Sequence, residues 1–592
     1  MNKKPSTLRR MLSYMKPHKG TVAIVVTLLL MITAMQLLRP IVIGNAIDQY
    51  ITGEAAQLLP AQERFSGVLK AAAVYLGILL LLFVTERLQY ILMQRMGQDI
   101  IHGMRLELFA HMESLTMRFF DTTPVGKIVT RITNDVEAIN ELYSNILSRL
   151  VQNGSRIIGL AIVMLCLNPA LAGLSFLLVP AVAGLCVACS VLSHRASAVT
   201  RTRLTQMNTF LSEHLSGMRL IRIFRREKQK LEEFRQTSQS LFRAGWKEMM
   251  VMAVFRPVIS VLSVLAMVIL LGGGSSGVLA GTVSLGTLYV FLQYIDSFFE
   301  PIQELSEQIS TLQAAIASAE KLFTFLDTQP LITDPEQPAP KKQVQGRIEF
   351  DHVWFAYDGE TWVLKDVSFV IEPGSSVAFV GATGAGKSSI LNLIGRYYDV
   401  QKGAIRIDGV DIRQLDRQVL RSWIGQVQQD VFIFTGDVAS NIRLMNEEIT
   451  DEQVESAAKH VNADRFIRRL PARYHEAVSE RGGTFSAGER QLLSFARTLA
   501  ADPAILILDE ATANIDTETE QLIQEAIGTL MQGRTTIMVA HRLSTIQHAD
   551  KIMVMHHGRI RETGTHQELL AMDGIYRKLY TLQLESGDRE PS

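Results

Sequence analysis

Six apolar segments in the first half of the chain constrain its fold more than any other feature. They lie at residues 20–47, 68–92, 146–167, 170–192, 251–279 and 285–305. Each is close to the roughly 20 residues that a helix needs to cross the hydrocarbon core of a bilayer. Of the 592 residues, 47% are hydrophobic and only 20% are charged. Because so many runs of this length with so few charges are rare in soluble bundles, the pattern predicts six membrane helices.

Basic residues indicate how these helices are oriented. The lead-in before the first segment and the connection between the fourth and fifth segments are rich in lysine and arginine, whereas the turns at 168–169 and 272–281 carry neither. The excess of basic residues on the cytoplasmic side predicts that both termini and both long connections lie in the cytoplasm. Residues 1–19 lack a signal-peptide cleavage site, so we expect them to be a retained cytoplasmic segment.

Cysteine content and net charge exclude several other classes. Cys166, Cys186 and Cys189 all lie inside apolar segments, so no disulfide framework is predicted, and we expect Cys186 and Cys189 to be small buried residues. Cys186 and Cys189 form a CxxC pattern, but no second pair or nearby histidine completes a metal site. The 59 basic and 59 acidic residues balance, so no basic surface indicates a nucleic-acid partner.

The second half of the chain has the pattern of an α/β domain. After the sixth segment a helical pattern continues to about residue 321, and Pro330, Pro335, Pro338 and Pro340 then mark a linker. Runs typical of strands alternate with helical patterns beyond it. We therefore expect a transmembrane domain at 1–325, a linker at 326–345, an α/β nucleotide-binding domain at 346–585 and a tail at 586–592.

The strongest local motif is the phosphate-binding loop at residues 381–388, Gly-Ala-Thr-Gly-Ala-Gly-Lys-Ser. It follows the apolar run 376–380 and opens a helical run, as this motif requires. Glycines allow backbone N–H groups to surround phosphates at a helix N-terminus, while the lysine neutralises phosphate oxygens and the serine hydroxyl ligates Mg²⁺. The predicted nucleotide-binding residues here are Gly381, Gly384, Gly386, Lys387, Ser388 and Ser389.

A second motif is the acidic pair Asp509-Glu510, which ends the apolar run 504–508. This pattern predicts a buried strand that delivers two carboxylates to the edge of the sheet where ligands bind in open α/β folds. We expect Asp509 to join the Mg²⁺ ligands and Glu510 to polarise the water that attacks the γ-phosphate.

Between these two motifs lies Phe-Ser-Ala-Gly-Glu at 485–489, followed by Arg490 and Gln491. In this order the motifs resemble those of the ABC transporter superfamily, and the resemblance covers nearly the whole chain. It implies that Tyr357 stacks on adenine, that Gln429 joins Mg²⁺ and couples the γ-phosphate to the membrane domain, and that His541 is the switch histidine. It also implies that residues 513–516 form the D-loop and that Ser486 and Gly488 contact ATP. The implied ligands are ATP and Mg²⁺.

The membrane half resembles the exporter type of this superfamily, with six helices ahead of the ATPase domain. Residues 119–131 and 216–221 look like the cytoplasmic loops that carry coupling helices. The resemblance implies a half-transporter in a bacterial cytoplasmic membrane that exports hydrophobic or cationic drugs. A lipid flippase would share every ATPase motif and stays an alternative. A soluble ABC ATPase lacks fused membrane helices, and an importer normally carries them on a separate chain.

The signature motif departs from the usual Leu-Ser-Gly-Gly-Gln at three positions, Phe485, Ala487 and Glu489. An added methyl group at a close-approach glycine and a carboxylate beside phosphates should weaken contact with ATP. In this superfamily the signature of one chain completes the ATP site of the other. The resemblance therefore extends to one subunit of heterodimeric bacterial multidrug exporters, paired with a second half-transporter chain.

The sixth apolar segment carries a polar face. Its members recur at spacings of three and four residues, so they share one side of a helix: Tyr289, Gln293, Asp296, Glu300 and Gln303. A carboxylate near mid-span costs about 2.5–3.5 kcal/mol, so Asp296 should avoid lipid. Either a basic residue such as Arg39 or Arg256 neutralises it, or Gln293, Asp296 and Glu300 attract cationic amphiphilic substrates while Phe291 and Phe298 supply apolar contact.

Overall fold

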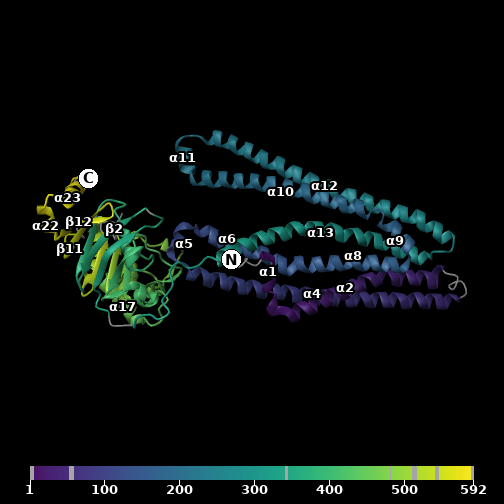
Figure 1. Ribbon diagram of the computed structural model, residues 1–592, viewed down its shortest axis with the longest axis horizontal. Helices are drawn as coiled ribbons and strands as arrows, with labels where there is room; N and C mark the ends of the chain where they lie inside the picture. Colours follow the sequence, from purple (N-terminus) through teal and green to yellow (C-terminus); the bar gives the residue numbers. More distant parts are fainter. Residues whose placement is uncertain are drawn as a thin grey trace. The chain divides into compact units, whose positions relative to one another are not determined.

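The computed structural model describes residues 6–52, 59–340, 344–359, 361–479, 482–509, 517–539 and 546–587. The chain divides into two compact units (Figure 1). The first consists of Met1–Ser114 and Pro124–Gln329, and the second of Leu115–Thr123 and Pro330–Ser592. The segment Leu115–Thr123, which the sequence analysis assigned to the membrane domain, thus clusters with the second unit.

The described residues of the first unit form helices joined by short turns, with no strand among them. Its long helices are α2 (Lys19–Ala46), α4 (Ala61–Ser114), α8 (Leu147–Leu167), α10 (Val179–Ser216), α12 (Glu227–Leu279) and α13 (Leu285–Leu326). Shorter helices are α1 (Thr7–Ser13), α6 (Val125–Thr130), α7 (Val136–Glu141), α9 (Pro169–Phe176) and α11 (Met218–Ile223). Three π-helical stretches, η2 (Ile47–Thr52), η3 (Arg131–Asp135) and η4 (Leu142–Ile146), extend or join them. Pro40, Pro257 and Pro301 lie inside α2, α12 and α13.

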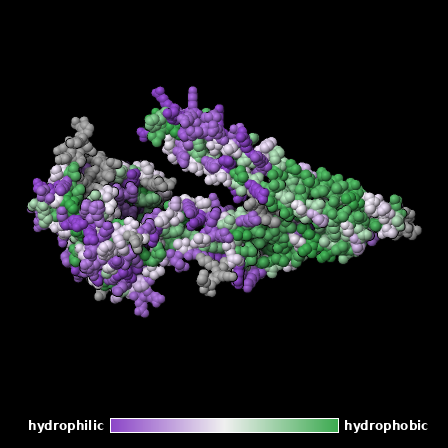
Figure 2. Space-filling view, turned by 45° about the horizontal axis from the view of Figure 1, so that its top comes forward, coloured by the Kyte–Doolittle hydropathy of each residue, from purple (hydrophilic) through white to green (hydrophobic). Residues whose placement is uncertain are grey.

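Among the described residues, five helical runs are long and apolar enough to cross a membrane. They are Lys16–Thr52, Ala61–Ser114, Val125–Leu167, Pro169–Ser216 and Glu227–Leu279. Only 6–28% of the apolar 18-residue stretch in each run is buried inside the protein. Hydrophobic residues cover the middle of this unit, while the ends of α10 and α12 beside α11 are hydrophilic (Figure 2). The start of α13, the sixth predicted segment, is helical but falls outside the five runs, since Gln293, Asp296 and Glu300 make it more polar.

The helices α2 and α13 touch backbone to backbone at one end. A β-carbon on Gly44 would lie 2.8 Å from the carbonyl oxygen of Gly286, so no larger residue fits at this crossing. Just beyond, the carboxylate of Asp48 accepts hydrogen bonds from the Gly286 backbone N–H, at 2.7 Å, and from the Ser284 hydroxyl, at 2.5 Å. Asp48 therefore caps the N-terminus of α13 from a different helix.

Two sheets and a short strand pair organise the second unit. The six-stranded sheet has the order β12-β11-β3-β10-β9-β6, and the four-stranded sheet the order β2-β1-β4-β5. Their strands are β1 (Ile348–Phe355), β2 (Leu364–Ile371), β3 (Ser376–Val380), β4 (Lys402–Ile407), β5 (Val410–Asp411), β6 (Ile424–Val427), β9 (Ile505–Asp509), β10 (Thr535–Val539), β11 (Lys551–His556) and β12 (Arg559–Gly564). A pair, β7 (Gly436–Asp437) with β8 (Ala477–Val478), completes the described strands.

Helices of the second unit flank these strands. They are α5 (Met117–Thr122), α14 (Lys387–Ile394), α15 (Arg417–Ser422), α16 (Val438–Arg443), α17 (Asp451–His460), α18 (Asp464–Ile467), α19 (Ala487–Ala500), α20 (Thr517–Met531), α22 (His566–Ala571) and α23 (Ile575–Gly587). Short 3₁₀ turns lie at Ile412–Gln414 and Arg473–His475.

The central strands of the six-stranded sheet, β3, β10 and β9, are buried on both faces. In β9, Leu506 and Leu508 belong to one apolar cluster, whereas Ile505 and Ile507 belong to the cluster on the opposite face. Because residues on both sides of such a strand are buried, its sequence is a continuous apolar run. Strands β6, β9, β10 and β3 are parallel neighbours, so their carboxyl ends meet at a single edge of the sheet.

Candidate ATP site

The phosphate-binding loop connects β3 to α14. Gly384 and Gly386 have φ angles of +80° and +102°, a region that favours glycine, and Gly386 directly precedes the first residue of α14. Lys387 is buried, and its Nζ donates to the carbonyl oxygens of Gly381, at 2.7 Å, and Ala382, at 3.2 Å. The lysine is thus held over the loop, at the helix N-terminus where anions bind.

Other predicted site residues follow neighbouring strands at the same sheet edge. Asp509 is the last residue of β9, and Gln429 follows β6 by two residues. Since β10 alone separates β9 from β3, the topology brings Asp509, Gln429 and the phosphate loop to one side of the sheet. Ser388 and Gln429 are exposed. Glu510, residues 513–516 and His541 lie outside the described residues.

The donor set at this edge fits Mg²⁺ by its chemistry. The Ser388 hydroxyl, the Asp509 carboxylate and the Gln429 amide carbonyl are all oxygen ligands, which Mg²⁺ prefers. When bound, the ion would neutralise phosphate charge. These three residues would hold it together with the nucleotide, while Lys387 supplies a further positive charge.

The signature motif begins helix α19. The Ser486 hydroxyl accepts from the Glu489 backbone N–H, at 3.2 Å, and the Glu489 carboxylate accepts from the Ser486 N–H, at 2.8 Å, which forms a capping box. Phe485 is buried and packs edge-on against Phe466. The Phe485 departure therefore falls in the core, whereas Ala487 and Glu489 alter the N-terminus of the helix.

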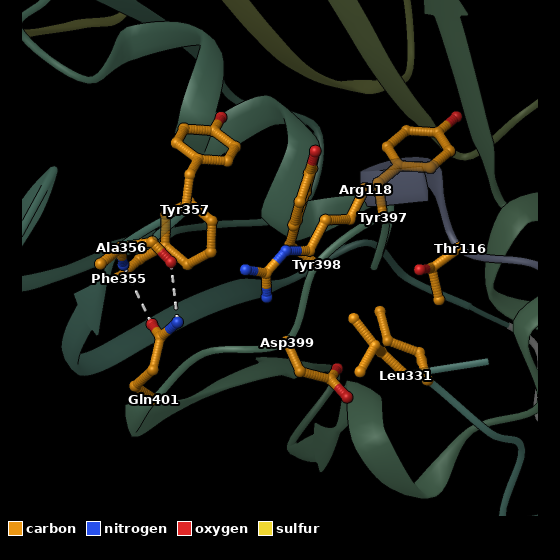
Figure 3. A pocket seen from close by; sticks show the side chains of 11 residues that line it. Thr116, Arg118, Leu331, Phe355, Ala356, Tyr357, Tyr397, Tyr398, Asp399 and Gln401 are labelled. Atoms are coloured by element: carbon orange, nitrogen blue, oxygen red, sulfur yellow. Dashed lines mark hydrogen bonds between the residues drawn. The ribbon is translucent and has the colours of Figure 1, made fainter. Parts of the chain in front are cut away.

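Tyr357 lies in the loop after β1 and faces α14. Its hydroxyl lies 3.0 Å from the Ser389 hydroxyl and accepts a weaker bond, at 3.4 Å, from the Asn392 amide. The Phe355 ring packs edge-to-face with it, at a centroid distance of 4.7 Å. A cavity of about 160 Å³ beside this loop is lined by residues of α5, the linker and the α/β domain (Figure 3). Its lining includes Thr116, Arg118, Leu331, Tyr357, Tyr397 and Tyr398.

The polar face of α13 is exposed on the first unit. Gln293, Asp296 and Glu300 are exposed, and Tyr289 is half-buried and accepts from the Gln293 amide at 2.9 Å. Asp296 accepts from the Ser263 hydroxyl of α12, at 3.1 Å. Arg39, one candidate partner for Asp296, donates instead to the Tyr75 hydroxyl, at 2.9 Å. The side chains of Arg256 and Gln303 lie outside the described residues.

An ion pair does form on this face, but at Glu300. Arg156 of α8 lies 3.1 Å from the Glu300 carboxylate, and Asn153, one turn earlier, donates to Glu304 at 2.8 Å. Of the three substrate candidates, Glu300 thus has a cationic partner, whereas Asp296 has a neutral hydroxyl.

Comparison with known proteins decides the family. Residues 22–302 match the ABC transporter transmembrane region, and residues 364–513 match the ABC transporter family. A protein of Bacillus subtilis described as a probable multidrug resistance ABC transporter ATP-binding/permease protein is 40% identical, over 89% of this chain and 80% of its own length. This chain belongs to the ABC transporter family.

Two further relatives of this ABC transporter bear on its function. An ATP-dependent lipid A-core flippase of Desulfotalea psychrophila is 35% identical, over 86% of this chain and 89% of its own length. A solved structure of a bacterial Atm1-family ABC exporter with ATP bound has a TM-score of 0.77 and 28% identity, over 95% of this chain and 98% of that one. These matches confirm the predicted fold class, a helical transmembrane domain followed by an α/β ABC domain.

The matches also confirm the predicted activity class. This ABC transporter is an integral membrane protein and an exporter half-transporter that binds ATP and couples its hydrolysis to transport. Sequence reasoning missed Arg156, Arg118, Asp358 and Tyr398, which contact the predicted sites. An aromatic pair three residues after the end of α14, Tyr397-Tyr398, was a signal for the last of these.

Proposed function

We propose that this ABC transporter is one half of a heterodimer that exports hydrophobic or cationic compounds across a bacterial cytoplasmic membrane. Its N-terminus and ATPase domain lie in the cytoplasm, where the basic residues of the lead-in and of the α10–α12 region also lie. The observation that carries this proposal is the exposed polar face of α13.

Asp296 supports both the pairing and the substrate class. It is exposed within a largely apolar stretch, and a charge at mid-membrane costs about 2.5–3.5 kcal/mol against lipid. We infer that this face meets a partner chain across a wet cavity. Among the described side chains, the hydrogen-bond partner of Asp296 is the neutral Ser263 hydroxyl, whereas Phe291 and Phe298, the aromatics expected to contact the substrate, are buried in the helix core. Such a face suits amphiphilic cations.

For ATP hydrolysis we assign roles on the motifs and on the sheet edge. Lys387 and the loop glycines bind the phosphates, Ser388, Asp509 and Gln429 hold Mg²⁺, and Tyr357 stacks on adenine. Glu510 polarises the attacking water and His541 positions the γ-phosphate. Hydrolysis then resets a membrane domain that ATP binding has switched outward.

Heterodimer formation is supported by the altered signature. Ser486 and Gly488 contact the nucleotide of the partner chain, and the capping box fixes the Glu489 carboxylate at that helix end. A negative charge there opposes the γ-phosphate. The complementary partner would have an intact signature, so that the ATP site using Glu510 is the active one.

Lipid flipping is the second candidate. The lipid A-core flippase match favours it, and the ATPase motifs do not discriminate. A large anionic lipid would bind best in a basic cavity. In such a cavity the positive charge of Arg156, and not the negative charge of Asp296, would attract the substrate.

The test is transport by proteoliposomes that contain this chain together with its co-purified partner. Uptake of a cationic dye, of a neutral amphiphile and of a fluorescent lipid is measured side by side. ATP-dependent transport of the dye with little lipid movement supports drug export, whereas lipid movement alone supports a flippase.

A further inference from the structure

The short helix α5 contacts the loop between β1 and β2 within the second unit. Arg118 of α5 lies 3.0 Å from the Asp358 carboxylate, and Asp358 directly follows Tyr357. Three residues further along α5, the Asp121 carboxylate accepts a short hydrogen bond from the Tyr398 hydroxyl. The helix thus reaches this part of the domain at two points.

Two tyrosines extend the second contact to the phosphate loop. The Tyr398 ring packs edge-to-face against the Tyr357 ring, with a centroid distance of 5.0 Å and an interplanar angle of 90°. The Tyr357 hydroxyl in turn lies 3.0 Å from that of Ser389, in the first turn of α14. Edge-to-face pairs fix the orientation of both rings. A continuous set of contacts therefore joins α5 to the helix that carries Lys387.

The loop is held at three successive residues. Ala356 exchanges two hydrogen bonds with the Gln401 amide, at 3.0 and 2.8 Å (Figure 3). Tyr357 is held by the ring contacts, and Asp358 by Arg118. Because Ala356 is anchored from the side of the sheet, a movement of α5 changes the placement of Tyr357 and is not absorbed by the backbone before it.

The connecting tyrosine is buried and stays a hydrogen-bond donor. Tyr398 is 8% exposed. Burial, and next the hydrogen bond to Asp121, hold the pKa of its hydroxyl above the ordinary value. The hydroxyl consequently keeps its proton, and its bond to Asp121, throughout the physiological pH range.

We propose that α5 sets the affinity of this chain's own ATP site for the adenine base, with Arg118, Asp121 and Tyr398 as positioning residues that act through Tyr357. The inference rests on the proposed stacking of Tyr357 on adenine. By linkage, adenine bound against Tyr357 stabilises the position of α5 to the same degree. Binding of the adenine base, and not only of the phosphates, then affects the position of the segment Leu115–Thr123.

The test compares two variants, Arg118→Ala and Tyr398→Phe, in the full-length transporter with its partner. We expect each to raise the KM for ATP about two- to tenfold, the range of an exposed ion pair to a hydrogen bond with a charged group, with kcat unchanged. Inorganic tripolyphosphate has no base, so its inhibition constant against ATP hydrolysis should not change. A merely structural defect would alter both constants.

A matched control and a rescue sharpen this experiment. Tyr397 lines the same cavity, but its hydroxyl donates to Gln426 and not to α5, so Tyr397→Phe should keep the KM for ATP. Combining Arg118→Asp with Asp358→Arg restores the ion pair and should recover much of the loss. An unchanged KM in both test variants, or an equal change for tripolyphosphate, overturns the inference.

A further variant separates this inference from the role of Tyr357 itself. If Tyr357→Ala leaves the KM for ATP unchanged, the stacking role is wrong and the inference falls with it. If Tyr357→Ala raises the KM while Arg118→Ala and Tyr398→Phe do not, stacking stands and only the link to α5 is wrong.

Discussion

Asp296 and Glu300 lie one turn apart on the polar face of α13, and they have partners of different charge. Asp296 is bonded to a neutral hydroxyl, so Asp296→Asn removes a net negative charge. Glu300 neutralises Arg156, so Glu300→Gln exposes a net positive charge. Both substitutions make the face less attractive to cations, and their combination should do so most strongly.

We therefore expect the double variant Asp296→Asn with Glu300→Gln to lose most transport of a cationic dye while basal ATP hydrolysis and transport of a neutral substrate persist. The measurement is dye and neutral-substrate uptake in proteoliposomes. Glu320→Gln, at an exposed position near the C-terminal end of the same helix, is the matched control. Equal loss of both substrates, or of neither, contradicts the assigned role of this face.

A second prediction concerns Glu510, which follows Asp509 in the sequence. Glu510→Gln keeps the shape of the side chain but removes the base, so steady-state ATP hydrolysis should fall about 10²–10⁴-fold while ATP still binds. Turnover and nucleotide binding are measured on the same preparation. Hydrolysis at a near-normal rate would remove Glu510 from the catalytic role.

Several residue contacts could not be predicted from the sequence. Arg156 and Glu300 are far apart in the chain, as are Asp121 and Tyr398, and one sequence carries no signal for which of many charged or aromatic side chains meet. The loop glycines and Lys387, by contrast, are constrained by local backbone geometry, and local geometry has a sequence pattern.

Among the helices, α19 allows two effects of its first turn to be measured separately. One is the effect of the Glu489 charge on ATP hydrolysis, and the other is the effect of the cap on the stability of the protein. A capping box accepts either glutamate or glutamine at its third position, so Glu489→Gln should keep the helix cap while it removes the carboxylate. We expect a higher rate of ATP hydrolysis by the assembled transporter and an unchanged Tm. The rate should rise further when Ala487→Gly is added.

Two measurements check this prediction, the ATPase rate and thermal unfolding followed by intrinsic fluorescence. Ser486→Ala, which removes the other half of the cap, should lower stability by about 0.5–2 kcal/mol. If Glu489→Gln lowers the rate, the negative charge of the native residue is not what weakens this signature.

The elements themselves were largely predictable. The apolar runs at β3 and β9 are buried on both sheet faces, and such strands have a distinctive sequence pattern. Strand order was not predictable, because β10, which pairs with both, comes later in the chain. The polar face of α13 was evident from its spacing, although its polarity also lowers the hydropathy that marks a membrane span.

For the whole molecule, the decisive prediction is dependence on a partner. This chain purified alone should form at best a poorly active homodimer, because both of its ATP sites would contain the altered signature. ATPase activity and transport should rise when the partner chain is co-expressed. Size-exclusion chromatography with mass determination establishes the assembly, and full transport by this chain alone would contradict the heterodimer.

The contact between α2 and α13 has a consequence for the speed of the transport cycle. At the Gly44–Gly286 crossing the backbones touch directly, so parting the helix ends there requires rehydration of Asp48 as well as exposure of Val290, which lies against Gly44. Each hydrogen bond to a charged group contributes about 1.5–3 kcal/mol. Water that enters this junction would replace both bonds of the carboxylate, so this end of the pair should open faster than an interlocked leucine seam of the same length.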